Sequence, residues 1–336
     1  MRIEQLNIEA FGGCNFSCQM CPQAKEMGGR ERDFLKTLPF NVFAKVVEDA
    51  MPYGLKAVSL HGSGEPTVHR ELEKMVRFVA ERNLHASFFT NGLRLTGVLF
   101  ERLVEAGLDL VTVSLVGANR ESYRKWMNQD SFETVLANLK DCREVMQRRP
   151  DEGEFHTRHL ITEPERKDEE IGEYRRNIID PLGCKAEIWM MQNWAGQYES
   201  EYNRFAHAPK KLRSCGRPFA ATLEVRAGGL NGHNAAVVPC PFVLGKDSQA
   251  VLGHLDTQSV AEVLSGQPFA HLRQAHQEER FDDISYCKDC DMLADDPEVL
   301  AWSNIPGRYV GQSKTSSVDY IAATPKEVDK LLPMLR

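Results

Sequence analysis

The 336-residue sequence contains no run that approaches the roughly 20 apolar residues needed to span a membrane. Its first residues, MRIEQL, lack the apolar core of a signal peptide. Positive charge is also not in excess, because the formal net charge is -7. Since phosphate binding requires a basic surface, this balance argues against a nucleic-acid groove. We therefore expect a cytoplasmic protein that contacts neither a membrane nor a nucleic acid.

The nine cysteines cannot all be paired in disulfides, because their number is odd. Reduced thiols in a cytosolic protein more often bind metal. Cys14, Cys18 and Cys21 have the spacing C-x3-C-x2-C, and three such thiolates can hold three corners of an iron–sulfur cube. No fourth cysteine lies nearby, so one iron is left open to a ligand. A zinc knuckle would also need a fourth ligand, and the closest histidine is His61.

Strand-like and helix-like segments alternate from residue 3 to about residue 192. Short apolar runs predict six strands, and amphipathic stretches predict helices between them. The strands are expected at 3–10, 57–60, 86–89, 110–115, 156–162 and 185–191, and the helices at 39–53, 67–82, 96–106, 131–148 and 166–179. Right-handed crossovers would make the strands parallel, and six are too few for a closed eight-stranded barrel. The sequence therefore predicts an α/β fold, a partial (β/α)6 TIM-like barrel over residues 1–192. The three-cysteine loop follows its first strand, at the edge where sites form.

A second, smaller α+β domain is expected over residues 214–295, after a connector with a short helix at 193–213. Glycines between 222–226 and 235–238 predict a hairpin, and a helix is expected near 258–278. Cys215, Cys240, Cys287 and Cys290 fall in this region, and four thiolates can close a site for iron–sulfur or zinc. The tail, 296–336, is predicted to end in a helix near 325–335.

The C-x3-C-x2-C loop resembles that of the radical S-adenosylmethionine (SAM) enzymes, over roughly residues 3–192. The resemblance implies a [4Fe-4S] cluster on Cys14, Cys18 and Cys21, whose open iron is chelated by the amino and carboxylate groups of SAM. In that family the reduced cluster cleaves SAM to a 5′-deoxyadenosyl radical, which removes a hydrogen atom from a small-molecule substrate. It also implies an external one-electron reductant of the flavodoxin or ferredoxin type.

The same resemblance assigns SAM-binding residues. Gly64 and Glu65, after the second strand, resemble the family's Gly-Gly-Glu motif, in which backbone carbonyls and the glutamate hold the SAM amino group. Asn91 and Ser114 lie at the ends of the third and fourth strands, where the family often contacts the SAM carboxylate or ribose. Met20 departs from the pattern, since the family frequently has an aromatic residue there, but the position mainly offers backbone contact to adenine.

The layout of the four later cysteines resembles the SPASM/twitch extensions of this family. A full SPASM domain has more cysteines and two clusters, so the resemblance implies one auxiliary [4Fe-4S] cluster held by four cysteines. Such a closed cluster can transfer an electron or stabilise the small domain, and zinc in its place is the remaining alternative.

Polar residues near strand ends and in the second domain are the candidate substrate ligands. On the fifth strand, either His156 and Arg158 or Thr157 and His159 face the cavity, because alternate residues point inward. The candidates are His61, Ser63, His156, Arg158, Gln192, Asn193 and Glu224. Cys142 and Cys184 are candidate hydrogen donors to a substrate radical, and otherwise buried structural thiols.

We expect a radical SAM enzyme that acts on a C–H bond of a small polar metabolite. Sugars, aminocyclitols or nucleosides, as in antibiotic biosynthesis, are the expected substrates. The first predicted strand begins almost at Met1, so we expect no preceding peptide-binding domain, which favours a small molecule over a peptide. Dehydrogenation with the auxiliary cluster as electron acceptor is the leading reaction. Epimerisation of a carbohydrate with a cysteine hydrogen donor, decarboxylation and peptide maturation are the alternatives. A non-catalytic iron–sulfur carrier or zinc-stabilised binding protein is the competing class.

Overall fold

The computed structural model describes residues 2–25, 36–196, 214–245, 249–293 and 299–311. The strands are β1 (Gln5–Ile8), β2 (Ala57–Ser59), β3 (His85–Thr90), β4 (Leu110–Ser114), β5 (Glu154–Ile161), β6 (Lys185–Met190), β7 (Thr222–Arg226), β8 (Ala236–Val238), β9 (Gly253–His254) and β10 (Leu300–Ser303). The α-helices are α1 (Pro22–Lys25), α2 (Phe40–Ala50), α3 (Leu72–Ala80), α4 (Gly97–Glu105), α5 (Arg120–Met127), α6 (Phe132–Arg148), α7 (Lys167–Tyr174), α8 (Asp180–Leu182), α9 (Val260–Ser265) and α10 (Gln267–Gln277).

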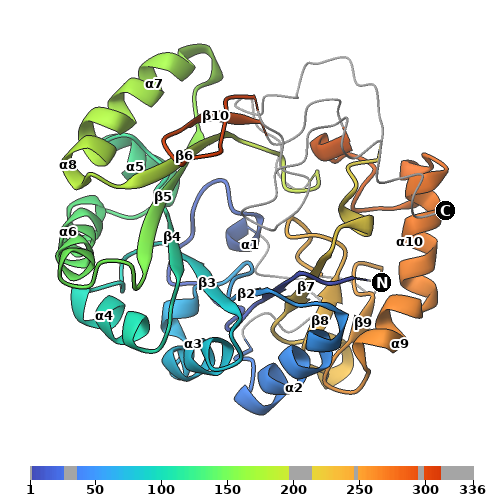
Figure 1. Ribbon diagram of the computed structural model, residues 1–336. Helices are drawn as coiled ribbons and strands as arrows, with labels where there is room; N and C mark the ends of the chain where they lie inside the picture. Colours follow the sequence, from blue (N-terminus) through green and yellow to red (C-terminus); the bar gives the residue numbers. More distant parts are fainter. Residues whose placement is uncertain (1, 26–35, 197–213, 246–248, 294–298, 312–336) are drawn as a thin grey trace.

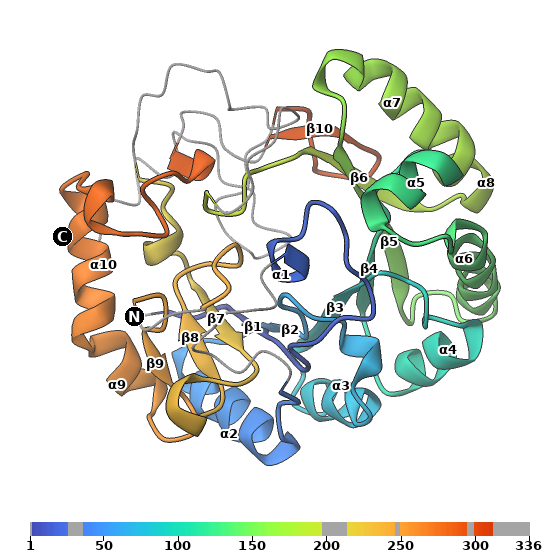
Figure 2. The same ribbon diagram turned by 180° about the vertical axis from the view of Figure 1, so that it is seen from behind.

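One curved sheet organises these elements, in the order β10-β6-β5-β4-β3-β2-β1-β7-β8-β9. The six strands β1 to β6 are parallel and adjacent in sequence order, which confirms the predicted partial (β/α)6 barrel. Helices α2, α3, α4 and α6 cover the outer face of the curved sheet, and α1 lies inside the curve (Figure 1). Figure 2 shows the same arrangement from behind.

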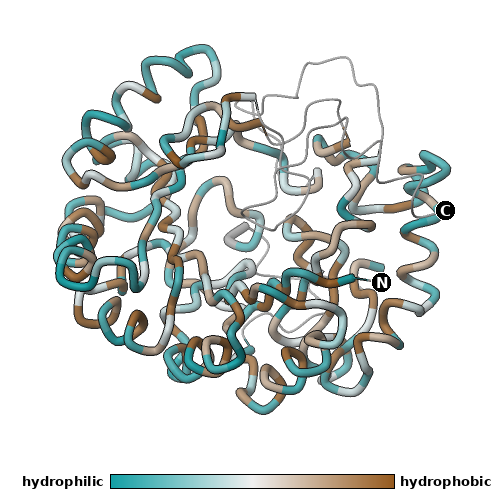
Figure 3. The backbone as a smooth tube through the Cα atoms, in the orientation of Figure 1, coloured by the Kyte–Doolittle hydropathy of each residue, from teal (hydrophilic) through white to brown (hydrophobic). Residues whose placement is uncertain are grey.

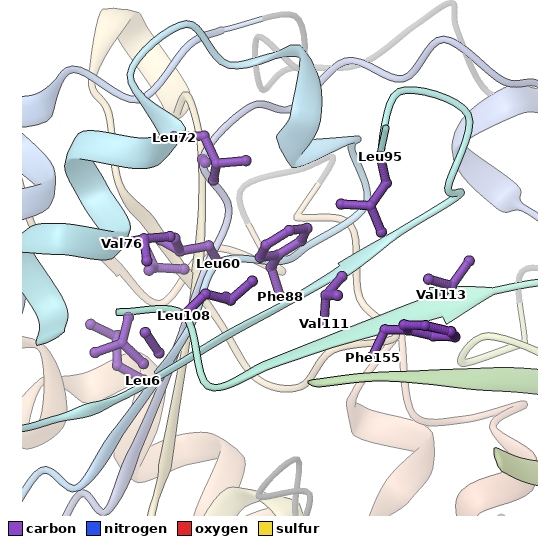
Figure 4. Close-up of a cluster of buried hydrophobic side chains, with 14 of the residues drawn as sticks. Leu6, Leu60, Leu72, Val76, Phe88, Leu95, Leu108, Val111, Val113 and Phe155 are labelled. Atoms are coloured by element: carbon purple, nitrogen blue, oxygen red, sulfur yellow. The ribbon is translucent and has the colours of Figure 1, made fainter. Parts of the chain in front are cut away.

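The core lies between this outer sheet face and the helices. Leu72 and Val76 of α3 point toward Leu60 and Phe88, and all four are at most 3% exposed (Figure 4). Apolar colour follows the strands and the helix turns that face them, whereas the outer turns are mostly polar (Figure 3). Burying one face of each amphipathic helix leaves the opposite, inner sheet face free to line a site.

The described strands of the predicted second domain, β7, β8 and β9, belong to the same sheet as the barrel strands. Strand β7 pairs in parallel with β1, with Gln5 opposite Thr222, and β8 pairs antiparallel with β7 as the predicted hairpin. A side-chain hydrogen bond reinforces the seam, because Asn7 Nδ2 donates to Glu224 Oε1 at 2.7 Å. The cysteine-bearing segment after residue 214 therefore extends the barrel sheet.

Several elements differ from the sequence-based expectation. Strand β10, in the segment predicted as a mixed tail, pairs antiparallel with β6 at the far edge of the sheet. Helix α5 was not predicted; it is strongly polar and begins at a capping box between Asn119 and Ser122. The predicted helix at 258–278 is divided into α9 and α10 at Gly266, with Pro268 in the first turn of α10. The helix expected at 325–335, and that of the 193–213 connector beyond residue 196, lie outside the described residues. Within the described part of the chain, no helix is both long and apolar enough to cross a bilayer.

Candidate active site

The loop after β1 carries the three-cysteine motif and is fixed at several points. The amide of Glu65 donates to the carbonyl of Gly13 at 2.8 Å, and the amide of Gln19 donates to the carbonyl of Trp126 at 2.8 Å. Cys18 Sγ lies 3.9 Å from Met127 Sδ, at the end of α5. The loop is therefore held between the β2 end on one side and α5 on the other.

The three thiols together need a positive partner. Burial raises the pKa of Cys14 to about 11, and burial followed by repulsion from the neighbouring thiolates raises the pKa of Cys18 further. Among the described residues, no three His, Cys, Asp or Glu side chains converge on a point that would suit one metal ion. A cube places each thiolate on a different iron. Three thiolates on one loop, each able to bind a different iron, fit three corners of an iron–sulfur cluster.

The loop after β2 packs directly on the cysteine loop, and only glycine fits at its contact. A Cβ on Gly64 would lie 1.9 Å from the carbonyl oxygen of Phe11 and 2.6 Å from that of Gly13. The adjacent Glu65 is 2% exposed, and its carboxylate accepts hydrogen bonds from four donors. Oε1 accepts from Thr67 N, Thr67 Oγ1 and Thr90 Oγ1, and Oε2 accepts from Asn91 N at 2.8 Å. This set holds the carboxylate rigidly at the wall of the site.

Asn91 and Ser114 lie where the resemblance assigned them, at the carboxyl ends of β3 and β4. Asn91 Nδ2 donates to Asn15 Oδ1 at 2.8 Å and lies 3.9 Å from Cys14 Sγ, so it touches the cysteine loop. Ser114 is opposite Arg158 of β5 in the sheet register. The side chains of Ser114 and Arg158 therefore offer a hydroxyl and a cation side by side.

These residues surround one cavity of about 300 Å³ on the inner face of the sheet. It reaches from the cysteine loop to the segment after β7 and β8. Its lining residues are Cys14, Phe16, Cys18, Met20, Cys21, His61, Gly62, Gly64, Glu65, Phe89, Thr90, Asn91, Ser114, Val116, Met127, Arg158, Leu160, Trp189, Gln192, Trp194, Arg217, Pro241 and Phe242. Gln192 Oε1 is buried at this wall and has no hydrogen-bond partner among the described residues, so it can accept one from a ligand.

The structure decides which face of β5 looks into the cavity. Arg158 and Leu160 line it, whereas His159 faces the helices, is fully buried, and contacts Glu170 Oε1 through Nε2 at 2.9 Å. The Arg158 guanidinium donates to Glu187 Oε2 at 2.8 Å and lies 4.7 Å from the centre of the Phe89 ring. This cation is thus positioned by an ion pair and an aromatic ring.

Four candidate substrate ligands do not line the cavity. Ser63 donates its amide and hydroxyl to Glu9 Oε1, and His156 pairs with Glu154 at 2.9 Å. Asn193 binds the loop after Cys290, since its amide donates to Asp291 Oδ2 at 2.7 Å. Glu224 accepts from Asn7 in the β1–β7 seam. The prediction is corrected for these four, because their polar groups are engaged in internal contacts away from the cavity wall. His61, Arg158 and Gln192 do line it.

Both candidate hydrogen donors lie elsewhere in the fold. Cys142 is fully buried in α6, and its thiol faces the carbonyl of Leu95 at 3.5 Å. Cys184 precedes β6, at the end opposite the cavity, and its Sγ is 3.8 Å from Thr157 Oγ1. Neither thiol lines the cavity, so the structure contradicts the prediction that either donates hydrogen to a substrate there.

The structure brings the four later cysteines to the wall of one cavity. Cys215, Cys240, Cys287 and Cys290 line one small cavity, with the Cys290 amide donating to the Cys287 carbonyl at 2.9 Å. Burial holds the pKa values of Cys287 and Cys290 well above their usual range, and repulsion adds to it, from the other cysteines for Cys287 and from Asp291 and then the other cysteines for Cys290. Such a set fits a closed metal cluster, whose positive charge offsets the thiolates.

Several wall residues were missed by sequence reasoning. Arg217 lines both the main cavity and the four-cysteine cavity, and Phe242 does so as well. Each follows a cysteine ligand by two residues, a signal that could have indicated them. Trp189 and Trp194, which add aromatic surface to the cavity, carried no such signal.

Comparison with known families decides the class of this site. The sequence profile described as Radical SAM superfamily matches residues 8–177, which include the three-cysteine loop and strands β2 to β5. The chain belongs to the radical SAM superfamily. It therefore has a [4Fe-4S] cluster with SAM, and the donor set described above fits both. A SPASM profile, described as an iron-sulfur cluster-binding domain, matches residues 232–291 and implies an auxiliary cluster.

Individual relatives of this radical SAM protein cover only part of it. A probable GTP 3',8-cyclase from Metallosphaera sedula is 30% identical over 42% of the chain and 43% of that protein. One from Saccharolobus islandicus is 34% identical over 43% and 44%. The chain thus spans less than half the length of these curated relatives.

Solved structures share the fold at low identity. BtrN in complex with AdoMet and 2-DOIA has a TM-score of 0.54 at 16% identity, covering 87% of this chain and 94% of BtrN. Streptococcus suis SuiB bound to precursor peptide SuiA has 0.63 at 13%, covering 87% and 70%. Native anSMEcpe with bound AdoMet has 0.57 at 14%, covering 98% and 96%.

Proposed function

We propose that the chain dehydrogenates a small polar metabolite, such as a sugar, aminocyclitol or nucleoside, with the auxiliary cluster as electron acceptor. One observation carries the proposal: a single cavity extends from Cys14, Cys18 and Cys21 to Arg217, Pro241 and Phe242. The last three residues lie one or two positions after Cys215 and Cys240, which we take as cluster ligands. A substrate in this cavity would therefore lie between the two cluster sites.

SAM, when bound to the cluster on the three cysteines and reduced by an external flavodoxin or ferredoxin, supplies a radical that abstracts hydrogen. The chain's own residues position the reactants. The fixed carboxylate of Glu65 suits the SAM ammonium, because charge-assisted hydrogen bonds are stronger than neutral ones. Arg158 beside Ser114 suits a carboxylate, either that of SAM or one on the substrate. We assign the SAM carboxylate to this pair because Ser114 is at a position where the family often contacts the SAM carboxylate or ribose, and Arg158 supplies the matching positive charge.

The remaining wall suits a small ligand with polar edges. Phe89, Trp189 and Trp194 offer aromatic surface, and Gln192 Oε1 offers a buried acceptor for a hydroxyl or amino group. A volume of about 300 Å³ is at the low end for small-molecule sites. Apolar walls also exclude water, which protects a reactive substrate intermediate from side reactions.

Dehydrogenation balances without a further reagent. The substrate loses one hydrogen atom, then one proton and one electron, so a C=O or C=N bond can form. The auxiliary cluster, which Cys215, Cys240, Cys287 and Cys290 would hold, would accept this electron for return to the external carrier, and one SAM would be consumed per product. Epimerisation would instead need a hydrogen donor at the cavity, and neither Cys142 nor Cys184 lies there.

The test uses the full chain, reconstituted anaerobically with iron and sulfide and reduced with dithionite in the presence of SAM. Aminocyclitols, sugars, nucleosides and GTP are supplied in turn, GTP because of the aligned cyclases. We expect 5′-deoxyadenosine in proportion to a product two mass units lighter than its substrate, and none with Cys14→Ala.

Other outcomes would overturn the proposal at different levels. A product of unchanged mass containing solvent deuterium would indicate epimerisation, and loss of carbon dioxide would indicate decarboxylation. A cyclised GTP would transfer the relatives' activity to this chain. If the wild-type chain and Cys14→Ala form equally little 5′-deoxyadenosine, catalysis itself is refuted and a carrier role is favoured.

A further inference from the structure

One buried histidine lies against the auxiliary-cluster ligands and has no part in the proposed chemistry. His276 is in α10 and is 2% exposed. Its Nε2 lies 3.5 Å from Cys287 Sγ, and its ring contacts Phe281 edge-on with centroids 5.2 Å apart. It also lines the small cavity that the four cysteines enclose. The imidazole is therefore packed so that one nitrogen faces a ligand sulfur.

The other nitrogen indicates where the ring proton lies. His276 Nδ1 is 3.1 Å from Ser214 Oγ, and the same Oγ accepts from the amide of Gly216 at 3.2 Å. Ser214 is 4% exposed, and among the described residues Nδ1 is the acceptor available to its hydroxyl proton. A buried hydroxyl donor needs such a partner. With Nδ1 accepting, the ring proton is on Nε2 and points at Cys287.

We propose that His276 donates an N–H···S hydrogen bond to the Cys287 thiolate of the auxiliary cluster and thereby raises the reduction potential of that cluster. Reduction adds one negative charge, and a donor at a ligand sulfur stabilises the more negative state. Hydrogen bonds to the sulfurs are among the factors that set cluster potentials, and groups behind the ligands tune metal sites generally. Ser214 is the positioning residue that orients the imidazole.

A higher potential suits a cluster that must take an electron from a substrate radical. This consequence rests on the proposed function, whereas the hydrogen bond itself rests only on the auxiliary cluster. Arg217 acts in the same direction, since its positive charge lies close enough to favour the thiolates of Cys215 and Cys240. His276 and Arg217 thus both lie beside the four-cysteine site, and both stabilise negative charge on its sulfur atoms.

The test is a potentiometric titration of the full-length, reconstituted protein followed by electron paramagnetic resonance. SAM is present, so that the signal of the three-cysteine cluster shifts and that of the auxiliary cluster can be followed separately. His276→Phe is expected to reduce the one-electron equilibrium constant about tenfold, a midpoint potential lower by about 59 mV. His276→Gln keeps an N–H donor and should recover part of the shift. Ser214→Ala should lower the potential in the same direction, by less.

The control is His69→Gln. His69 is a comparably buried histidine whose Nε2 faces the Leu38 carbonyl, and it does not line either cysteine cavity. The midpoint potential of the auxiliary cluster in His69→Gln should equal that of the wild type. If His276→Phe binds too little iron to titrate, Ser214→Ala and His276→Gln decide.

An unchanged midpoint potential in every variant that retains the cluster would overturn the inference, whatever the product assay shows. Conversely, a lowered potential without any oxidised product would support the hydrogen bond and count only against dehydrogenation. The two proposals therefore fail separately.

Discussion

The contact between the two SAM-site loops can be tested by one methyl group. In Gly64→Ala, the new Cβ would lie 1.9 Å from the Phe11 carbonyl oxygen and 2.6 Å from that of Gly13. Both obstacles are backbone atoms, so no side chain can rotate away. The same loops share the hydrogen bond from Glu65 N to Gly13 O, one residue before Cys14. Relief of the clash must therefore separate Glu65 from the cysteine loop.

The size of the effect follows from the distance. Real Cβ atoms essentially never approach other atoms closer than 3.0 Å, so the loops must part by roughly 1 Å. A misplacement of about 1 Å in reacting groups can cost about 100-fold in rate. The packing penalty itself is about 1–3 kcal/mol, which a domain of ordinary stability survives. We expect a folded protein with SAM cleavage reduced about 100-fold.

The assay measures 5′-deoxyadenosine formation with dithionite, together with iron content and thermal unfolding. Gly172→Ala in α7 is the matched control, because its Cβ would meet only Arg176 Nη1, at 3.2 Å. Alanine in place of that helical glycine should be neutral or stabilising by up to about 1 kcal/mol. Wild-type cleavage and full iron content in Gly64→Ala would refute the argument that this contact sets the SAM site.

Four further outcomes are expected from the same structure. Glu65→Gln turns one acceptor of the four-donor site into a donor, so the free energy of unfolding measured in urea should fall by about 1–3 kcal/mol and SAM should bind more weakly. An unchanged free energy of unfolding together with an unchanged affinity for SAM would contradict the assigned hydrogen bonds. Arg158→Met removes the cation beside the assigned carboxylate. The Kd for SAM should therefore rise about 10- to 150-fold, from the 1.5–3 kcal/mol of a charge-assisted hydrogen bond, and an unaltered Kd would leave Arg158 to the substrate. Cys142→Ala and Cys184→Ala should give the same product as the wild type, and a change in product would restore the thiol-donor idea. Removal of iron by a chelator should increase amide exchange around Cys290 more than in β3, since the cluster would link Cys215, Cys240, Cys287 and Cys290, which are far apart in sequence. Equal protection with and without iron would show that the cluster is not structural.

Much of the barrel follows from local patterns. The short, β-branched apolar run 110–115 predicted β4, and the amphipathic stretch at 131–148 predicted α6 because burial of one helix face repeats along it. Helix α5 was not predicted from the sequence because it is short and mostly polar, and its start is marked only by a capping box. Strand β10 escaped because four residues carry too little pattern, and its partner β6 supplies the register.

The candidate site divides in a similar way. The cysteine spacing and the Gly64–Glu65 loop predicted a cluster and a SAM contact from residues near one another in sequence, and the structure brings both loops to one cavity. The sequence did not decide which face of β5 points into the barrel, since alternation of side chains defines two faces but does not show which of them is the inner one. Cys142 and Cys184 show the converse error: a reactive residue type was given a role that its position does not allow.

The sequence by itself determined the cluster chemistry and the βα order, because thiolate spacing and hydrophobic periodicity act over a few residues. Tertiary structure decided which residues from distant parts of the sequence line a common cavity with the three-cysteine loop. The pairing of β7 with β1 joins residues 217 positions apart, as between Asn7 and Glu224, and places Arg217 and Phe242 on the wall of the cavity that Cys14, Cys18 and Cys21 also line. It also places His276 against Cys287. Such contacts depend on how whole faces pack, and no local pattern encodes them.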